Sequence, residues 1–66
     1  MEMIRVSSDA ISAVGYDQET RRMRIRFTSG NSYDFCRVPL EIYERLMRSS
    51  SKGSFYNDHI RGRYQC

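Results

Sequence analysis

Apolar and basic residues alternate one for one in the segment from Arg22 to Phe27. Successive side chains of a β-strand point to opposite faces, so this alternation predicts a strand with two unlike faces. The apolar face carries Met23, Ile25 and Phe27, and the basic face carries Arg22, Arg24 and Arg26. We expect the apolar face to be covered by the rest of the chain and the arginine face to look the opposite way.

A hairpin follows this strand. Residues 33–35 read as the next strand, and Gly30 and Asn31 tolerate the positive φ that tight hairpin loops need. A three-residue loop at 29–31 puts aromatic pairs on one face and an ion pair on the other, whereas a two-residue loop mixes the faces. The predicted register pairs Phe27 with Tyr33, Arg26 with Asp34, and Ile25 with Phe35.

The sheet extends toward the N-terminus. Residues 11–16 predict the first strand, and a four-residue turn at 17–20 would pair Val14 with Met23. Ile11 breaks the alternation, so we expect a bulge or a later strand start there. Three apolar residues nearer the terminus either add an edge strand or simply pack: Met3, Ile4 and Val6.

Residues 40–50 predict one amphipathic helix. Its apolar stripe recurs at helical spacing and consists of Leu40, Tyr43, Leu46 and Met47. Pro39 suits a helix start, and Gly53 is the expected C-terminal stop. The remaining residues, 54–66, predict a short helical turn or an irregular segment, and their apolar side chains must dock on the sheet or the helix.

Together these segments predict an α+β fold in a single domain, residues 1–66. The domain is a three-stranded antiparallel β-meander with one amphipathic α-helix on one face and a short C-terminal segment. A chain of 66 residues buries only about 60% of its unfolded surface. A homodimer is one way to bury more.

Charge and cysteine content limit the functions that this chain is expected to have. The net charge is +3, and all basic residues except Lys52 are arginines, which suit phosphate and base recognition. We expect no metal and no cofactor, because His59 is the only histidine and the cysteines are two. Cys36 reads as a small apolar strand residue and Cys66 as a free thiol, with a disulfide between them the open alternative. That usage suits a reducing cytoplasm, and we expect no signal peptide and no membrane span.

A set of residues along nearly the whole chain carries a family resemblance. They are Ile11, residues 14–17, Phe27, Gly30, residues 33–35, Val38, Pro39, Tyr43, Leu46, Ser51, Gly53, residues 55–57, Ile60, Arg61 and Tyr64. In this order and spacing they resemble the KTSC domain, a small bacterial and phage module also found at the C-terminus of some lysyl-tRNA synthetases. The family's Tyr-x-Tyr motif has Phe35 as its second ring here, which indicates a core role for that position.

The resemblance and the charge pattern favour a non-enzymatic binding module. The synthetase association implies RNA or another nucleic acid as partner. The candidate residues are Arg22, Arg24, Arg26, Arg61 and Arg63 for phosphates, with an exposed Tyr56 or Tyr64 for stacking. Ala13 and Gly15 fall on the arginine face and leave space for either a partner or the chain's own tail.

Two other interpretations compete with RNA binding. The arginines could form a solvated face partly neutralised by Asp34 and Glu19. Alternatively, an open sheet edge and the aromatic tail could serve a protein partner or a homodimer. An enzyme is disfavoured, because neither His59 nor Cys36 has an identifiable acid–base partner.

Overall fold

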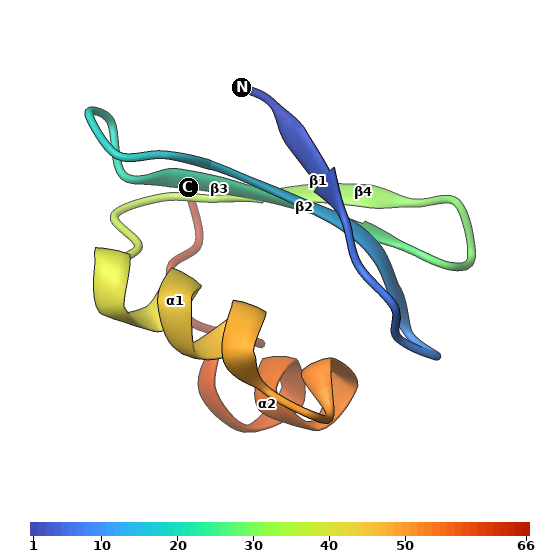
Figure 1. Cartoon of the computed structure of the whole chain (residues 1–66). Coiled ribbons are helices and arrows are strands. Elements are labelled where there is room, and N and C mark those ends of the chain that lie inside the picture. The colour runs from blue at the N-terminus through green and yellow to red at the C-terminus, as the bar shows by residue number, and fades with distance from the viewer.

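A four-stranded antiparallel sheet, in the spatial order β1-β2-β3-β4, is followed by two helices. The computed structural model describes residues 1–66. Its elements are β1 (Met3–Arg5), β2 (Ile11–Asp17), β3 (Arg22–Phe27), β4 (Ser32–Phe35), α1 (Leu40–Arg48) and α2 (Lys52–His59). Both helices lie on the same side of the sheet, so the molecule has two layers (Figure 1). The α+β class is confirmed, but the sheet has one strand and the chain one helix more than the sequence predicted.

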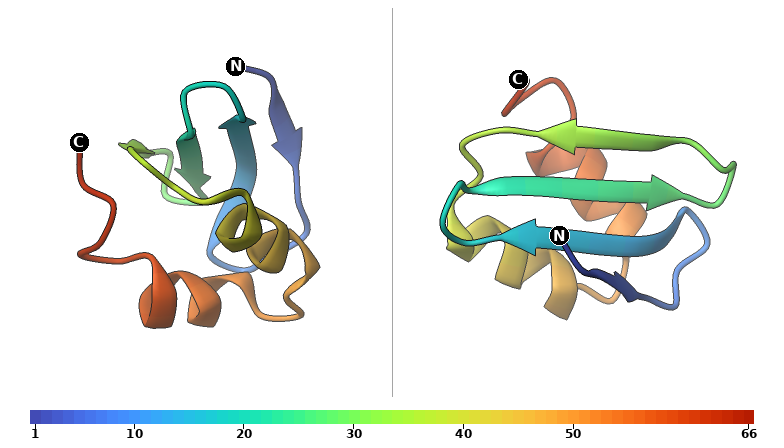
Figure 2. Two further views of the ribbon diagram at one scale, coloured as in Figure 1. Left: turned by 90° about the vertical axis from the view of Figure 1, so that its left-hand side faces the viewer. Right: turned by 90° about the horizontal axis from the view of Figure 1, so that it is seen from above.

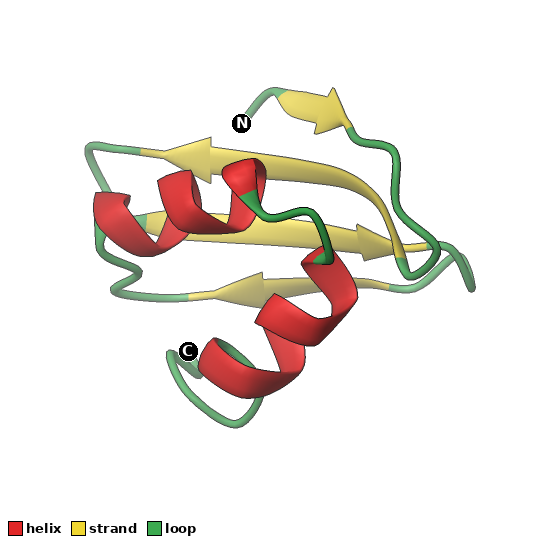
Figure 3. Ribbon diagram, turned by 60° about the horizontal axis from the view of Figure 1, so that its bottom comes forward, coloured by secondary structure: helices red, strands yellow, loops and turns green.

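The alternation in β3 sets the two faces of the sheet as predicted. Met23 and Ile25 have no exposed surface, whereas Arg22, Arg24 and Arg26 are all exposed. Both helices cover one side of the sheet (Figure 3), and Met23 and Ile25 lie in the core on that side. We call the opposite side, which no helix covers, the outer face.

The β3–β4 register differs from the predicted one by two residues. Arg24 pairs with Asp34 and Ile25 with Tyr33, and the loop is residues 28–30. Phe27 closes it: its N–H donates to the Asn31 carbonyl at 2.8 Å, and its carbonyl accepts from the Gly30 N–H at 2.9 Å. Gly30 has φ +101°, so this hairpin takes its glycine at the last loop position. A shift of two preserves face parity, which is why the faces were predicted correctly and the pairs were not.

The β2–β3 turn is displaced in the same way. Val14 pairs with Ile25, not with Met23, and Asp17 remains in β2. The Asp17 carboxylate accepts a hydrogen bond from the Glu19 N–H at 3.0 Å, so it closes the turn from the end of the strand. The expected irregularity at Ile11 is confirmed as a register shift between Ile11 and Ala13.

The N-terminal residues form β1, which pairs with β2 along one edge of the sheet. Met3 lies opposite Gly15, and a Cβ added at Gly15 would lie 2.7 Å from the Met3 Sδ atom and 2.9 Å from the Glu2 carbonyl. The space beside Gly15 is therefore filled by the N-terminal segment. It is neither an open platform nor a seat for the C-terminal tail.

The core lies between the sheet and the helices. Its buried members are Ile11, Val14, Met23, Ile25, Phe35, Val38, Leu46 and Ile60. The predicted stripe of α1 is confirmed for Tyr43, Leu46 and Met47, but Ile42 packs against the core in place of Leu40. Leu46 is fully buried, and the Tyr43 ring stacks on Tyr16 with 4.7 Å between centroids. Tyr16 is fixed further by donating its hydroxyl to the Val38 carbonyl at 2.6 Å.

Gly53 lies inside α2 and does not end α1, which contradicts the predicted helix stop. A Cβ added at Gly53 would lie 3.0 Å from the Ala10 Cβ. The glycine thus serves a close approach between α2 and the start of β2. After α2, Ile60 enters the core, and Gly62 turns the chain back with φ +75°.

The tail is tied to the end of β4 by a disulfide between Cys36 and Cys66, with 4.9 Å between their Cα atoms. The interpretation of Cys36 as an apolar strand residue and of Cys66 as a free thiol is therefore wrong. Cys36 follows the buried Phe35, so alternation turns its side chain away from the core. The Cys36 N–H also donates to the Tyr64 carbonyl at 2.7 Å, which places the tail along β4.

Candidate nucleic-acid interface

The outer face is open across β3 and β4, whereas the N-terminal segment covers β2 at Gly15. Seen from above the sheet, both helices lie beneath it (Figure 2). Arg22, Arg24 and Arg26 share this face, and alternate residues of a strand lie about 6.5–7 Å apart. The predicted line of three guanidinium groups is thus exposed, and the C-terminal segment does not cover it.

The strand β1 adds a basic residue that sequence reasoning missed. Arg5 pairs with Ala13, which pairs with Arg26, so the three residues form one row on the outer face. Arg5 is exposed. Its position follows from the register of β1, and the three apolar residues that suggested an edge strand did not fix that register.

The arginine at the centre of the face is paired. Arg24 donates from Nε to Asp34 Oδ1 at 2.7 Å and from Nη2 to Oδ2 at 3.1 Å. The hydrogen bond from Arg24 lowers the pKa of Asp34, and the charges of Arg24 and Arg22 lower it further. The same pair raises the pKa of Arg24. The predicted pair between Arg26 and Asp34 is wrong, because the register shift puts Ser32 opposite Arg26.

Three arginines of the outer face have no carboxylate partner, since Arg24–Asp34 is the only salt bridge in the structure. They are Arg5, Arg22 and Arg26. The face therefore offers unpaired guanidinium groups on both sides of a neutralised centre. Each guanidinium group carries five N–H donors in a planar fork, and this arrangement matches the geometry of phosphate oxygens.

The tyrosines proposed for stacking lie elsewhere. Tyr56 is half-buried, with its ring centroid 5.0 Å from that of Phe27 and 6.0 Å from that of Phe35. Tyr64 is half-buried against the core. Both rings are only partly exposed, and the structure does not bring them to the arginine face.

The two arginines of the tail, Arg61 and Arg63, are exposed in the loop after α2. The tail rises beside β4 toward the outer face (Figure 2). A cavity of about 520 Å³ lies between the tail and β4, and we call it the β4 groove. Its lining residues are Tyr33, Asp34, Phe35, Tyr56, Arg61, Gly62, Gln65 and Cys66.

Tyr33 is the unexpected member of the β4 groove. Alternation places it on the same face as Phe35, but Tyr33 is 53% exposed while Phe35 is 6% exposed. The Tyr33 ring still meets the Phe27 ring edge-on, with 5.8 Å between centroids. Both residues lie on the helix side of the sheet, and only the packing of α2 distinguishes them.

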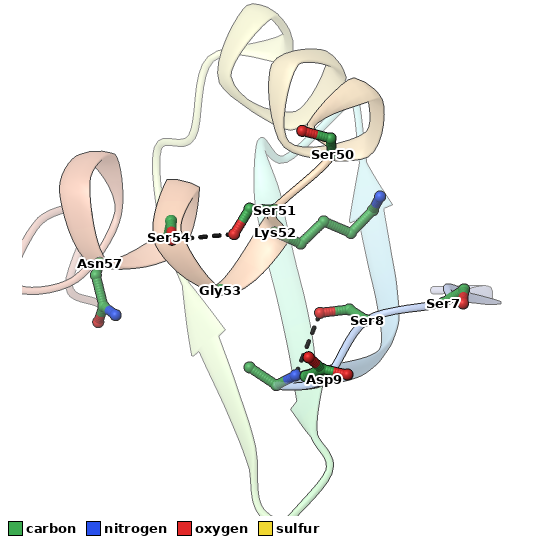
Figure 4. A pocket seen from close by; sticks show the side chains of 10 residues that line it. Ser7, Ser8, Asp9, Ser50, Ser51, Lys52, Gly53, Ser54 and Asn57 are labelled. Atoms are coloured by element: carbon green, nitrogen blue, oxygen red, sulfur yellow. Dashed lines mark hydrogen bonds between the residues drawn. The ribbon is translucent and has the colours of Figure 1, made fainter.

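A second cavity, of about 510 Å³, lies between residues 7–10 and the start of α2 and is mostly polar (Figure 4). Its polar groups serve the chain itself. The Ser8 hydroxyl accepts from the Ala10 N–H at 3.2 Å, and Lys52 donates to the Ser49 carbonyl at 3.0 Å. Ser51 and Ser54 bond each other at 3.0 Å. We therefore interpret this cavity as a junction between the two segments.

No cluster of three potential metal-ligating side chains occurs in the structure. His59 packs against Phe55 with 4.5 Å between ring centroids. Neither helix is both long and apolar enough to cross a membrane.

Comparison with known proteins identifies the family. The family model of the KTSC domain matches residues 7–64. A KTSC domain protein from Yersinia pestis has a crystal structure that aligns with a TM-score of 0.94 at 32% identity, covering 98% of this chain and 92% of that one. This chain belongs to the KTSC domain family.

KTSC relatives occur in two contexts. A protein from Tsukamurella paurometabola is 37% identical over 60 residues, which cover 91% of this chain and 90% of the relative. A lysine–tRNA ligase from Nostoc punctiforme is 30% identical over 63 residues, or 96% of this chain and 11% of the ligase. A similar ligase from Nostoc sp. is 29% identical over the same length. The KTSC sequence thus matches both a short protein and a small part of a large enzyme.

Proposed function

We propose that this KTSC domain is a small non-enzymatic module that binds RNA through the outer face of its sheet. The observation that carries the proposal is the exposure of Arg5, Arg22 and Arg26, without carboxylate partners, on a face that no helix covers. A fold does not imply a function, so the argument rests on these side chains.

The geometry suits a nucleic-acid backbone. The guanidinium groups of β3 follow one another at about 6.5–7 Å, comparable with the spacing of phosphates along a strand. Arginine forks bind phosphate oxygens in pairs. Contacts of this kind carry no sequence information, so binding is weakly selective and falls as salt rises.

The relatives support RNA as the nucleic acid. The Nostoc proteins that contain a similar stretch are named lysine–tRNA ligases, and tRNA is the macromolecule in that name. A module linked to a ligase would supply a second RNA-binding site at high effective concentration, and so would raise the affinity of the ligase for RNA.

The test is a titration of fluorescent single-stranded RNA, followed by anisotropy at 50 mM and 150 mM salt. The variant Arg22→Gln/Arg26→Gln removes two unpaired arginines, and the control Arg48→Glu reverses an exposed charge on α1. Both variants lower the net charge of +3 by two, so a difference in affinity between them does not come from net charge.

We expect the double variant to lose about tenfold or more in affinity. The slope of log affinity against log salt concentration should become shallower by about 0.7 for each lost phosphate contact. The control should lose much less. Absence of binding by the original chain at 50 mM salt, or equal losses in the two variants, would refute the proposal.

A protein-interaction or homodimer module is the second candidate. The observations that favour it are the two open sheet edges, β1 and β4, and three exposed large apolar side chains, Met1, Ile4 and Tyr33. Size-exclusion chromatography with light scattering tests it. A dimer that persists at high salt and is lost on deleting residues 54–66 favours this candidate, and a monomer argues against it.

We propose a cytoplasmic location with one qualification from the disulfide. Structural disulfides are rare in a reducing cytosol, where such bonds are usually transient or redox-sensing. In that compartment Cys36 and Cys66 would exist as thiols for part of the time, and the tail would be joined covalently to β4 only in the oxidised protein.

A further inference from the structure

The β4 groove has features that phosphate binding on the outer face does not explain. It combines an exposed aromatic ring, an unpaired guanidinium group and open backbone groups within one cavity of about 520 Å³. Pockets that take small ligands measure about 300–1,000 Å³ and pair apolar walls with a few placed polar groups. The groove lies within that range.

The aromatic ring belongs to Tyr33. More than half of the residue is exposed, yet its ring meets Phe27, and Phe27 in turn meets Tyr56 with 5.0 Å between centroids. The ring is thus supported from behind by a row of aromatic contacts. A supported, accessible tyrosine is the type of surface on which nucleobases stack.

The open backbone groups belong to the free edge of β4. Phe27 and Asn31 form a hydrogen-bonded pair, so the alternation of an antiparallel ladder directs the N–H and C=O groups of Ser32 and Asp34 outward. The next outward N–H, that of Cys36, is already taken by the Tyr64 carbonyl. The Asp34 carbonyl contacts Cys66 Sγ at 3.8 Å. The edge between the hairpin loop and the tail therefore keeps the N–H and C=O of Ser32 and the N–H of Asp34 open beside the groove.

The charge around the groove is positive. Arg61 lines it and Arg63 follows in the same loop, and neither forms a salt bridge. The one carboxylate of the lining, Asp34, is held by Arg24, and Arg22 lies near enough to lower its pKa. This balance favours a polyanion over an acidic or neutral peptide strand as the occupant.

We infer that the β4 groove is a binding site for an unpaired nucleobase of single-stranded nucleic acid. The base stacks on Tyr33, and the flanking phosphates contact Arg61 on one side and the outer face on the other. The inference rests on the proposed function and deepens it, because it names the strandedness of the ligand. Bases of a duplex are stacked within the helix and cannot enter, so the groove selects single strands.

The test compares an octamer of uridine with a duplex RNA of the same length. Tyr33→Leu removes the stacking surface, and Tyr33→Phe keeps the ring and serves as control. Circular dichroism melting of both variants checks that they fold, which the exposure of Tyr33 leads us to expect.

We expect Tyr33→Leu to weaken binding of the uridine octamer about tenfold and to leave duplex binding unchanged, since stacking on one aromatic side chain accounts for effects of this size. Tyr33→Phe should bind the octamer within about twofold of the original chain. An octamer that carries abasic sites should bind the original chain as weakly as the uridine octamer binds Tyr33→Leu.

Separate outcomes distinguish the two claims. If Tyr33→Leu binds the octamer normally while Arg22→Gln/Arg26→Gln does not, the groove inference fails and the proposed function stands. If the original chain binds neither RNA, both fail. If Tyr33→Leu only converts a dimer to a monomer in light scattering, the groove is an interface with a second copy and the inference is overturned.

Discussion

At the scale of single residues, exposure depends both on the side of the sheet on which a side chain lies and on the neighbours that cover it. Met23, Ile25 and Phe35 are buried as predicted. Tyr33 has the same parity as Phe35 but lies beyond the cover of α2, so it is half exposed. The error at Cys36 was the opposite one. It was interpreted as an apolar strand residue, although alternation with Phe35 directs its side chain away from the core.

The ion pair at the centre of the outer face makes stability depend on pH. Asp34 has a lowered pKa in the folded protein, while an aspartate in an unfolded chain titrates near pH 3.9. Its contribution is therefore fully present above about pH 4 and is lost as the pH falls through the lower, folded value. We expect the stability difference between the original chain and Asp34→Asn to be largest near pH 7 and to vanish at strongly acid pH.

Urea unfolding at a series of pH values and low ionic strength measures this difference. Arg24→Gln removes the other partner of the pair and should show the same pH dependence as Asp34→Asn. A difference that stays constant from pH 7 down to pH 2 would show that the pair does not bear on stability.

At the scale of elements, the type and order of segments could be predicted and the registers could not. Loop length follows from composition, but loop position depends on single residues. Gly30 sets it in the β3–β4 turn through its positive φ, and Asp17 sets it in the β2–β3 turn through its carboxylate. The second helix was predicted only as a short turn after residue 54, because Gly53 resembles a helix stop and instead lies inside α2. Its contact with Ala10, which calls for a glycine, is long-range and has no local signal.

The tail depends on its covalent link to β4. The disulfide joins residues 30 positions apart, and closing a loop of that length stabilises a fold by about 3–4 kcal/mol in the chain-entropy treatment. We expect the double variant Cys36→Ser/Cys66→Ser to lose about this much in urea unfolding. Because Gln65 and Cys66 line the β4 groove, the variant should also bind the uridine octamer more weakly.

A dithiol reductant supplies the matched control. It should lower the stability of the original chain to that of the double serine variant and leave the variant unchanged. Equal stability of the oxidised chain and the variant would show that the tail holds without the bond, through contacts such as that between Arg37 and the Gln65 carbonyl.

At the scale of the whole molecule, the chain puts both helices on one side of a twisted sheet and leaves the other side to arginines (Figures 1 and 2). The sequence predicted this division from β3 alone. It did not predict that the tail would pass around the β4 edge, because that path depends on Gly62, Tyr64 and the disulfide acting together. The consequence is that exposed arginines lie on both sides of β4, on the outer face and in the tail beside the groove.

A titration of the isotope-labelled chain with single-stranded RNA, followed by amide chemical shifts at low salt, tests this surface most directly. The account predicts that the shifts gather on β3, on β4 and on residues 61–66, and that α1 stays unchanged. Shifts that gather on α1, or no shifts at all at millimolar RNA, would contradict it.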